Sequence, residues 1–203
     1  MELKERFRSF LPIVVDVETG GTEPDRHALL ELCVVVPERQ EDELVVRKVG
    51  IHNWNVTPYD ASAVETGSLE VSGIDLSRED RISIPEEQAM RECFQTVRKA
   101  IRRHGCTRAI ATGHNAHFDL AVMKAAAKRH GIKRDPFHPF SVLDTVSLSA
   151  VAYGHTVLSV ACERAEIAFD CDRAHSARYD ATVTAKLFCR LVNSSSYSRS
   201  GLP

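Results

Sequence analysis

The amino-acid sequence predicts a single domain of the α/β class, in which helices flank a mixed sheet. The chain has 203 residues, a length that suits one domain with a substantial hydrophobic core. With 43% hydrophobic and 27% charged residues, its composition is typical of soluble globular proteins. Apolar, strand-like segments come first, and helix-like and strand-like segments then follow in turn, an order that predicts helices packed against a sheet.

The first part of the chain predicts strands that pair as an antiparallel meander. Residues 11–18, LPIVVDVE, form an apolar run that ends in acids and is followed by the turn residues Gly20 and Gly21. Residues 28–37 predict a second strand that is almost wholly apolar. Residues 43–49 alternate polar and apolar side chains and predict a third strand, which an antiparallel meander places beside the others.

The rest of the chain predicts one long loop followed mainly by helices. Residues 52–84 are polar and contain Pro58, so we expect a long loop with a short helix. A helix is expected from Pro85, a residue that suits the start of a helix, to about Arg103. The remaining predicted elements are a strand at 108–112, a helix at 117–130, a strand end that enters a helix at 142–154, a short helix at 156–167 capped by Thr156, and a last helix at 176–193.

One domain and one compartment are expected. We assign residues 1–193 to the domain and expect residues 194–203, a polar tail, to be disordered. No apolar stretch is long enough to span a membrane, and the first residues lack the apolar core of a signal peptide, so we expect a cytoplasmic protein. The six cysteines form no CxxC pair and are expected to be free, mostly buried thiols: Cys33, Cys93, Cys106, Cys162, Cys171 and Cys189.

Positive charge is concentrated in short stretches, although the formal net charge of the chain is −2. Such stretches are typical of nucleic-acid-binding surfaces, but Lys and Arg on helices more often only keep a surface solvated. Bound divalent cations would also offset the excess of acids. The main stretch contains no acid and consists of Arg98, Lys99, Arg102, Arg103 and Arg108; other clusters are Arg6 with Arg8, and Lys124, Lys128, Arg129, Lys133 and Arg134.

Four acids and one histidine are candidates for a catalytic site. Asp16 and Glu18 lie two apart on a predicted strand and therefore project from the same face. Asp119 lies at the start of a predicted helix. Asp180 lies on the last predicted helix, and His175 lies on the loop before it. Taken singly, each has an ordinary explanation: a solvent-facing strand edge, a charge at a helix N-terminus, or a surface histidine.

Taken together, the four acids predict a site for two divalent cations. Converging carboxylates repel one another, and burying them is costly unless positive charge lies among them. Paired cations stabilise the attacking and leaving oxygens of a phosphodiester displacement. A histidine can take a proton from the attacking water near neutral pH, so His175 is the general base in this interpretation.

The motifs VDVET, GHNAHFD and AHSARYD, in this order, resemble those of the DEDDh 3′→5′ exonuclease family, and most closely its ribonuclease T-like members. Phrases without catalytic residues, such as KRDPFHPF, add to the resemblance, which covers most of the chain outside about residues 38–85. It implies a ribonuclease H-like fold. It also implies 3′→5′ trimming of the 3′ ends of stable RNAs, including tRNA, with single-stranded DNA ends as further substrates.

The resemblance also assigns roles to individual residues. His175 would be the general base, nucleoside 5′-monophosphates would be released, and the ligands of two Mg²⁺ or Mn²⁺ ions would be Asp16, Glu18, Asp119 and Asp180. The family forms homodimers, in which a basic patch of one subunit faces the active site of the other. The residues that match parts of this patch are Arg8, Arg98, Lys99, Arg102, Arg103, Arg108, Lys133 and Arg134.

Aromatic residues are the part in which the chain departs from the family. Four phenylalanines near the family's site stack on substrate bases. Phe118 and Phe140 match two of them, whereas Thr22 and Val71 occupy the other two positions. Core packing is the alternative role for both phenylalanines. Because each stacked base contributes ~1–3 kcal/mol, we expect intact catalysis with an altered preference for the terminal base.

Two polar residues near these motifs are assigned structural roles. Asp144 precedes a predicted helix and is expected to cap it, with the orientation of a ligand as the alternative role. Asn115 is expected to hold the GHNAHFD turn through side-chain hydrogen bonds.

Other functions explain the sequence less well. A proofreading exonuclease, which acts on DNA together with a polymerase, would not be expected to carry the FHPF and AHSARYD phrases or the basic patch. A catalytically silent RNA-binding module would not need all five candidate catalytic residues. A small-molecule hydrolase would be expected to contain a GxSxG motif or a P-loop, and the sequence contains neither.

Overall fold

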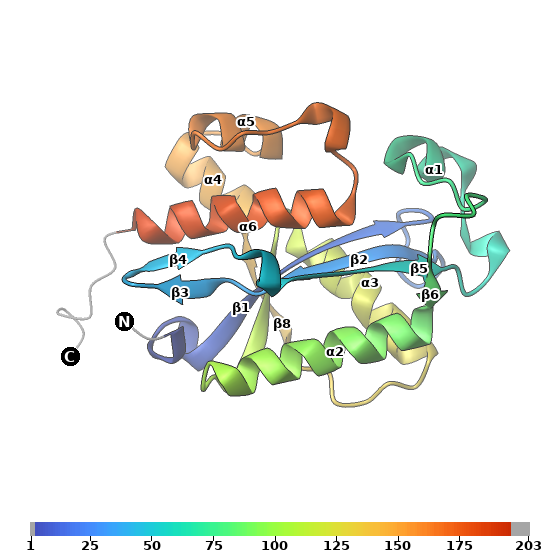
Figure 1. Ribbon diagram of the computed structural model, residues 1–203, viewed down its shortest axis with the longest axis horizontal. Helices are drawn as coiled ribbons and strands as arrows, with labels where there is room; N and C mark the ends of the chain where they lie inside the picture. The colour runs from blue at the N-terminus through green and yellow to red at the C-terminus, as the bar shows by residue number, and fades with distance from the viewer. Residues whose placement is uncertain (1–2, 196–203) are drawn as a thin grey trace.

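The computed structural model describes residues 3–195, in which a six-stranded mixed sheet lies between two groups of helices (Figure 1). The strand order is β6-β5-β2-β1-β7-β8. Antiparallel pairs join β1, β2 and β5, whereas β7 and β8 run parallel to β1, so the predicted α/β class with a mixed sheet is confirmed. The strands of the sheet are β1 (Phe10–Thr19), β2 (Leu29–Val35), β5 (Ile51–Thr57), β6 (Ile84–Pro85), β7 (Arg108–Gly113) and β8 (Phe137–Asp144), and β3 (Glu38–Gln40) and β4 (Glu43–Val45) form a separate hairpin.

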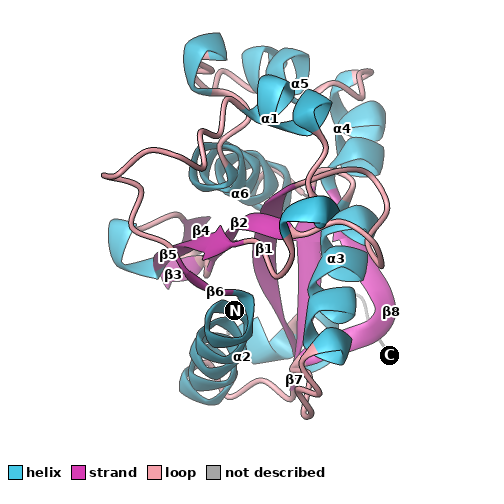
Figure 2. Cartoon of the chain, turned by 90° about the vertical axis from the view of Figure 1, so that its right-hand side faces the viewer, coloured by secondary structure: helices cyan, strands magenta, loops and turns pink. Residues whose placement is uncertain are grey.

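Helices cover both faces of the sheet, as the view in Figure 2 shows. On one face α6 packs against β1 and β2, with α4 and α5 on its outer side, and on the other face α2 and α3 contact each other and the sheet. Within residues 3–195 no single helix has the length and apolar character needed to cross a membrane; α4 and α5 pass that test only as a pair bent by 43°, and by length and composition alone. The α-helices are α1 (Thr66–Ser72), α2 (Glu86–Arg103), α3 (Ala116–Arg129), α4 (Thr145–Tyr153), α5 (Leu158–Arg164) and α6 (Ala177–Asn193), and short 3₁₀ turns are Leu3–Glu5, Phe7–Ser9, Lys48–Gly50, Ala61–Ala63 and Cys171–Arg173.

Strand β1 forms the centre of the core because its first half is apolar on both faces. Residues 11–15 are buried, since the central position of β1 leaves helices on either side of it. From Asp16 onward the strand alternates, with Val17 buried and Asp16 and Glu18 half-buried. The strand therefore carries two acids to the margin of the core on one face, as the sequence predicts.

The third strand of the predicted meander lies later in the chain than residues 43–49. Its place is taken by β5, whereas only Glu43–Val45 of that segment is a strand, paired with β3 outside the main sheet. The sequence does not predict β5 as a strand, because most of its side chains are half-buried or exposed and only Val56 is fully buried. Trp54 attaches β5 to α2 by donating a hydrogen bond of 2.9 Å to Glu92 Oε2. The segment 52–84 therefore contains the expected short helix, α1, but it also contains most of β5 and the first residue of β6.

Local polar contacts confirm one predicted cap and correct two other expectations. Asp144 caps α4, since its Oδ1 accepts the backbone N–H two residues later over 2.9 Å. Thr156 does not cap α5, whose N-cap is Val157; the carbonyl oxygen of Thr156 lies 2.7 Å from His114 Nε2 instead. Asn115 has φ +74°, which asparagine tolerates, and its backbone N–H rather than its side chain bonds Asp144 (3.3 Å).

The first two residues of the predicted tail, Ser194 and Ser195, are bonded to other parts of the described chain. Ser194 and Ser195 donate backbone hydrogen bonds to the last turn of α6, and the Ser195 hydroxyl accepts one of 2.8 Å from Arg6 Nη2. These two residues thus contact α6 and Arg6, and the rest of the predicted tail, residues 196–203, lies outside the described part of the chain. The boundary predicted at residue 193 coincides with the end of α6.

The cysteines are free, and most of them are buried, as the sequence predicts. All six cysteines are free. Cys106 is half-buried and Cys171 is exposed, whereas the buried thiols are Cys33, Cys93, Cys162 and Cys189.

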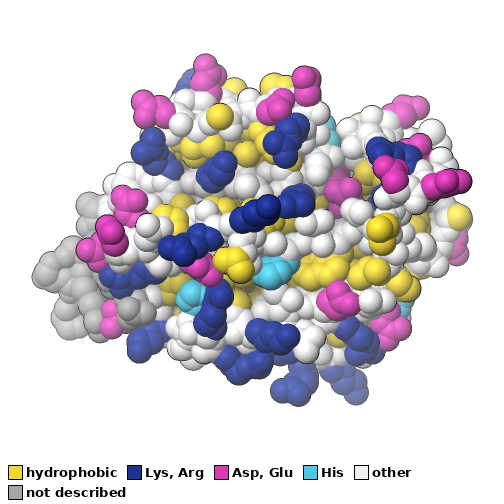
Figure 3. Space-filling view, in the orientation of Figure 1, with side chains coloured by type: hydrophobic (Ala, Val, Ile, Leu, Met, Phe, Trp, Pro, Cys, Tyr) yellow, Lys and Arg dark blue, Asp and Glu magenta, His cyan; other side chains and the backbone are white. Residues whose placement is uncertain are grey.

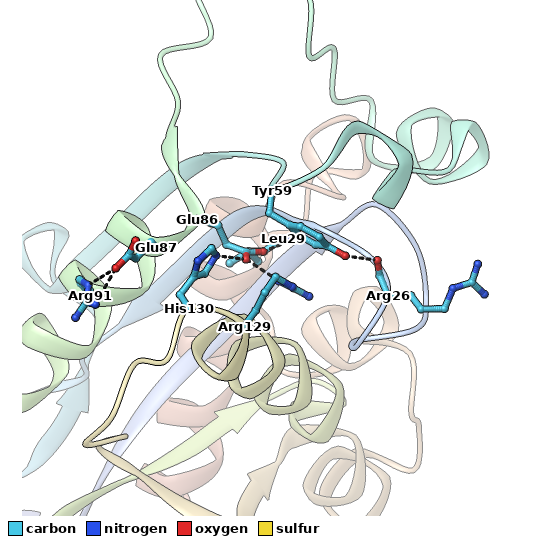
Figure 4. Close-up of polar contacts among 8 residues, drawn as sticks. All are labelled: Arg26, Leu29, Tyr59, Glu86, Glu87, Arg91, Arg129 and His130. Atoms are coloured by element: carbon cyan, nitrogen blue, oxygen red, sulfur yellow. Dashed lines mark hydrogen bonds and ion pairs between the residues drawn. The ribbon is translucent and has the colours of Figure 1, made fainter.

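A buried carboxylate holds the end of the sheet from which the acids project (Figure 4). Glu86, the first residue of α2, is 2% exposed, and its Oε2 accepts from Arg129 Nη1 (2.6 Å) and lies 2.8 Å from His130 Nε2. Its Oε1 accepts the N–H of Leu29 over 3.3 Å. Leu29 lies at an irregularity of the β1–β2 ladder beside Glu18, so the network ties α2 and α3 to this point of the sheet. Removing one partner of such a buried pair costs about 3–5 kcal/mol.

Candidate active site

Three carboxylates from distant parts of the sequence meet at the margin of the core. Asp16 and Glu18 come from β1, and Asp180 comes from the first turn of α6. Their ligand oxygens all lie within 4.8 Å of one another. Asp119, at the start of α3, is only 5% exposed, and its Oδ1 accepts the backbone N–H of Val17 over 2.9 Å. The structure thus brings the four predicted acids together around one segment of β1, and we refer to them as the acid cluster.

The acid cluster is electrostatically unfavourable without positive charge. Burial, and then the charges of Asp119, Asp180 and Glu18, raise the pKa of Asp16 well above its usual value. Burial and the charge of Asp180 raise the pKa of Glu18 to about 8. Burial raises the pKa of Asp119 to about 7, and it also raises the pKa of Asp180. These groups offer only carboxylate oxygens, the ligands that hard divalent cations prefer, and the cluster therefore fits such ions.

His175 lies at the entrance to α6, as the sequence predicts. It follows the short turn Cys171–Arg173 and is exposed, with φ +64°. Its backbone N–H donates a hydrogen bond of 2.8 Å to Oδ2 of Asp180. The structure therefore connects this histidine to the acid cluster through its backbone and leaves the imidazole exposed.

Sequence reasoning missed a fifth acid, Glu31. It lies on β2, directly opposite Glu18 of β1, and its Oε2 accepts the backbone N–H of Ala177 over 3.1 Å. Burial raises its pKa, whereas the Ala177 N–H and the charge of Arg81 lower it. The available signal was a lone acid within the apolar run ALLELCVVV, where a buried charge is costly without a partner.

The two predicted stacking residues lie in different places. Phe118 is half-buried beside Asp119 and packs against the main core. Phe140 is 73% exposed, its ring lies 4.7 Å from that of His138, and the His138 ring lies 5.3 Å from Phe10 at the start of β1. Within one chain, Phe140 is therefore grouped with the start of β1 and not with the acid cluster, because strand β8 enters the sheet at that end.

Thr22 and Val71, which stand where the resemblance predicts phenylalanines, are both exposed. Thr22 is exposed on the loop after Gly21. Val71 is 66% exposed near the end of α1 and lines a hollow of about 470 Å³ together with His175. A valine and the candidate base therefore line the same hollow.

The predicted basic patch gathers at the end of β1 opposite to the acid cluster. Arg108 is paired in register with Phe10, and the guanidinium of Arg8 lies 5.3 Å from the Phe10 ring. Phe10 and Glu18 are separated by about 26 Å along the strand at ~3.3 Å per residue. Figure 3 shows Lys and Arg side chains along the lower margin of this face, over α2. The other predicted members are Arg98 and Arg103, which bond the Arg134 carbonyl (3.2 Å) and Glu38 (2.9 Å), and Lys99, Arg102, Lys133 and Arg134, which are exposed.

Comparisons with known proteins place the chain among exonucleases. A family model described as Exonuclease matches residues 13–188. The chain is 48% identical over 191 residues to ribonuclease T of Hahella chejuensis, covering 94% of this chain and 87% of that protein. It is 47% identical to ribonuclease T of Marinobacter nauticus, covering 94% of this chain and 86% of that protein.

Solved structures agree on the fold. Exonuclease I of E. coli, in complex with a dT13 oligonucleotide, superposes with a TM-score of 0.67 at 16% identity, over 91% of this chain and 41% of that chain. The nuclease domain of 3′hExo, a DEDDh family member bound to rAMP, gives a TM-score of 0.65 at 15% identity, over 90% of this chain and 91% of that chain. The predicted ribonuclease H-like fold is confirmed by this likeness. The chain therefore belongs to the exonuclease family and is a hydrolytic 3′→5′ exonuclease.

Proposed function

We propose that this enzyme trims the 3′ ends of structured RNAs, including tRNA, and releases nucleoside 5′-monophosphates. Single-stranded DNA ends are further substrates in this proposal. The observation that carries it is the convergence of Asp16, Glu18 and Asp180 within 4.8 Å, in a chain that is 48% identical to a ribonuclease T. A cytoplasmic location belongs to the same proposal.

Two divalent cations would be held by the acid cluster, with Mg²⁺ as the expected ion and Mn²⁺ as an alternative. The raised pKa values of Asp16 and Glu18 support this assignment, because such carboxylates are fully ionised near neutral pH only beside positive charge. When bound, these cations supply positive charge to the attacking and leaving oxygens of the phosphodiester.

The protein's own groups place the reacting atoms and move the proton. His175 is assigned as the general base that takes a proton from the attacking water. Its backbone bond to Asp180 holds it next to the acid cluster, and its exposed imidazole can approach an entering 3′ end. The bond from Val17 N–H to Asp119 holds that carboxylate at a fixed distance from β1. Phe118, beside Asp119, is assigned to contact the terminal base.

The basic patch is assigned to a neighbouring subunit's substrate in a homodimer. A cationic surface at the start of β1, about 20 Å from Asp16 and about 26 Å from Glu18 at ~3.3 Å per residue of strand, is too far away to contact the scissile phosphate of its own chain. The exposed Phe140 shares the patch's end of β1 and belongs to the same assignment. Phosphate contacts to the patch would supply salt-dependent affinity for RNA.

The test uses a 5′-labelled duplex RNA with a short 3′ overhang, incubated with and without Mg²⁺. We expect trimming from the 3′ end that needs the metal and disappears in Asp16→Asn, with Asp25→Asn, an exposed acid on the loop after β1, as the matched control. Binding without trimming by the natural protein would favour a silent RNA-binding module. Trimming of DNA ends but not of the RNA would favour a proofreading-type enzyme.

A further inference from the structure

Glu31 lies beside the acid cluster without belonging to it. It is opposite Glu18 in the β1–β2 ladder and, like Asp119, lies outside the group of three carboxylates whose oxygens converge within 4.8 Å; unlike Asp119, which accepts the N–H of Val17 on β1, it accepts an N–H of α6. Its charge contributes to the raised pKa values of Glu18 and Asp16. A further acid in this position makes the cluster less favourable, so its presence calls for a separate role.

The contact of Glu31 with α6 supplies that role. Its Oε2 accepts the N–H of Ala177, the first residue of α6, over 3.1 Å. The first N–H groups of a helix have no partner within the helix, and negative charge there is stabilised by the helix dipole. The contact therefore joins β2 to α6 between His175, two residues earlier, and Asp180, three residues later.

The same segment is bonded from its other side by Asp180. Oδ2 of Asp180 accepts the N–H of His175 over 2.8 Å. His175 has φ +64°, a conformation that residues other than glycine adopt rarely and only where their surroundings hold them. The backbone from His175 to Ala177 is thus held by one carboxylate on each side of Ser176. This backbone fixes the Cα–Cβ direction from which the exposed imidazole of His175 projects.

Arg81 provides the positive charge that accompanies Glu31. Its guanidinium donates to the carbonyl oxygens of Leu30 (2.8 Å) and Val56 (3.4 Å), so it is held against β2 and β5. Burial lowers the pKa of Arg81, and the charge of Glu31 opposes that change. The two side chains influence each other through space, and Arg81 offsets part of the charge that Glu31 adds beside the acid cluster.

We propose that Glu31 is a positioning residue for the general base, with Arg81 as its countercharge. Its carboxylate holds the first turn of α6, so that His175 and Asp180 keep their places relative to β1. In this role it acts through α6 and not on the reacting atoms. The proposal rests on the role of His175 given under the proposed function.

The kinetic test separates the acceptor from the charge. Glu31→Met removes the acceptor at similar volume, and Glu31→Gln keeps an acceptor oxygen without the charge. Groups that orient a catalytic shell typically contribute about 10–100-fold to activity, so we expect Glu31→Met to lower kcat by that factor with KM changed less than about twofold. Glu31→Gln should stay within about fivefold of the natural protein, since a neutral hydrogen bond differs from a charged one by ~1 kcal/mol. Glu92→Gln is the matched control, because Glu92 is an acid on α2 that accepts a hydrogen bond from Trp54 of β5. This variant should leave kcat unchanged.

A second measurement needs neither RNA nor metal. Hydrogen exchange at the Ala177 amide in the metal-free protein should be at least about tenfold faster in Glu31→Met and close to natural in Glu31→Gln, because protection follows the local opening equilibrium. Glu31→Ala replaces the Met variant if that variant does not fold. The proposal would be overturned if Glu31→Met, or Glu31→Ala in its place, left both the exchange rate and kcat unchanged. It would also be overturned if Glu31→Met and Glu31→Gln lowered kcat equally. Exchange that changes as expected in a protein that trims no RNA would contradict the proposed function alone.

Discussion

The two ends of β1 carry opposite chemistry. At its start, Phe10 lies with Arg8, Arg108 and the exposed Phe140. At its end, Asp16 and Glu18 meet acids from α3 and α6. One central strand therefore separates two kinds of surface. Its end carries carboxylates beside buried backbone, and its start carries cations and an exposed aromatic ring. The following experiments test this division from its largest expected effect to its smallest.

The largest effect is expected at the acid end, in the pH dependence of stability without metal. The pKa values of Glu18 and Asp119 are raised from 4.5 and 3.8 to about 8 and about 7. Between about pH 4 and pH 8 the folded protein therefore binds more protons than the unfolded chain. Its free energy of unfolding falls as pH rises through this range. Because a tenfold change in a group's proton affinity corresponds to ~1.4 kcal/mol, several kcal/mol of stability should be lost between about pH 5 and pH 8.

Urea unfolding in EDTA at a series of pH values measures this loss. Saturating Mg²⁺ should reverse the slope, because the ion binds the ionised carboxylates and thus stabilises the folded protein more at high pH. Asp16→Asn should flatten the metal-free slope and raise stability at pH 8, whereas Asp25→Asn should change neither. A metal-free protein whose stability rises with pH across this window would show that the acids are not a repulsive cluster.

The second experiment asks whether the basic end serves another subunit. Asp16→Asn alone and Arg8→Ala/Arg108→Ala alone should each trim RNA poorly. If the patch serves the neighbouring subunit, a mixed dimer has one intact site facing one intact patch, and random mixing in equal amounts should restore about a quarter of natural activity. Mixtures of each variant with itself are the control. No restoration, despite proof of subunit exchange, would assign the patch to its own chain or to no role.

The smallest effect is expected from restoring an aromatic ring at the hollow beside His175. Val71→Phe should strengthen the grip on the terminal base by ~1 kcal/mol, or about fivefold in KM, and should change the order of preference among 3′ ends. The measurement compares hydrolysis of RNAs ending in A, C, G and U. Val151→Phe, at a site on α4 that is 91% exposed, is the matched control. Equal changes in both variants would mean that Val71 does not face the terminal base.

Much of the acid end could be predicted from sequence because its determinants are local. A carboxylate two residues from another on an apolar strand has to share its face. Asp119 follows β7 directly in the first turn of α3, whereas Asp180 reaches the cluster only through the packing of α6. The sequence likewise predicts that Asp144 caps α4, because this role depends only on the residues directly after it. The fold class followed from the order of elements, with β5 as the main omission, because its half-exposed polar residues give no apolar pattern.

What escaped prediction depends on contacts across the sheet. The role of Glu31 requires the register that sets it opposite Glu18 and below the start of α6. The location of Phe140 requires knowing at which end β8 enters the sheet. Neither register is encoded in a short stretch of sequence, because each is decided by the packing of segments far apart in the chain.

The dependence of the acid cluster on α6 has a consequence for how the enzyme matures during synthesis. Asp180 and the backbone of His175 reach the cluster only through α6, the last element among the described residues. Contacts between β1 and α6 span most of the sequence, and such long-range contacts form late because the loop between them has to close first. A chain in which α6 has not yet been made and packed against β1 therefore lacks Asp180 and has no complete acid cluster.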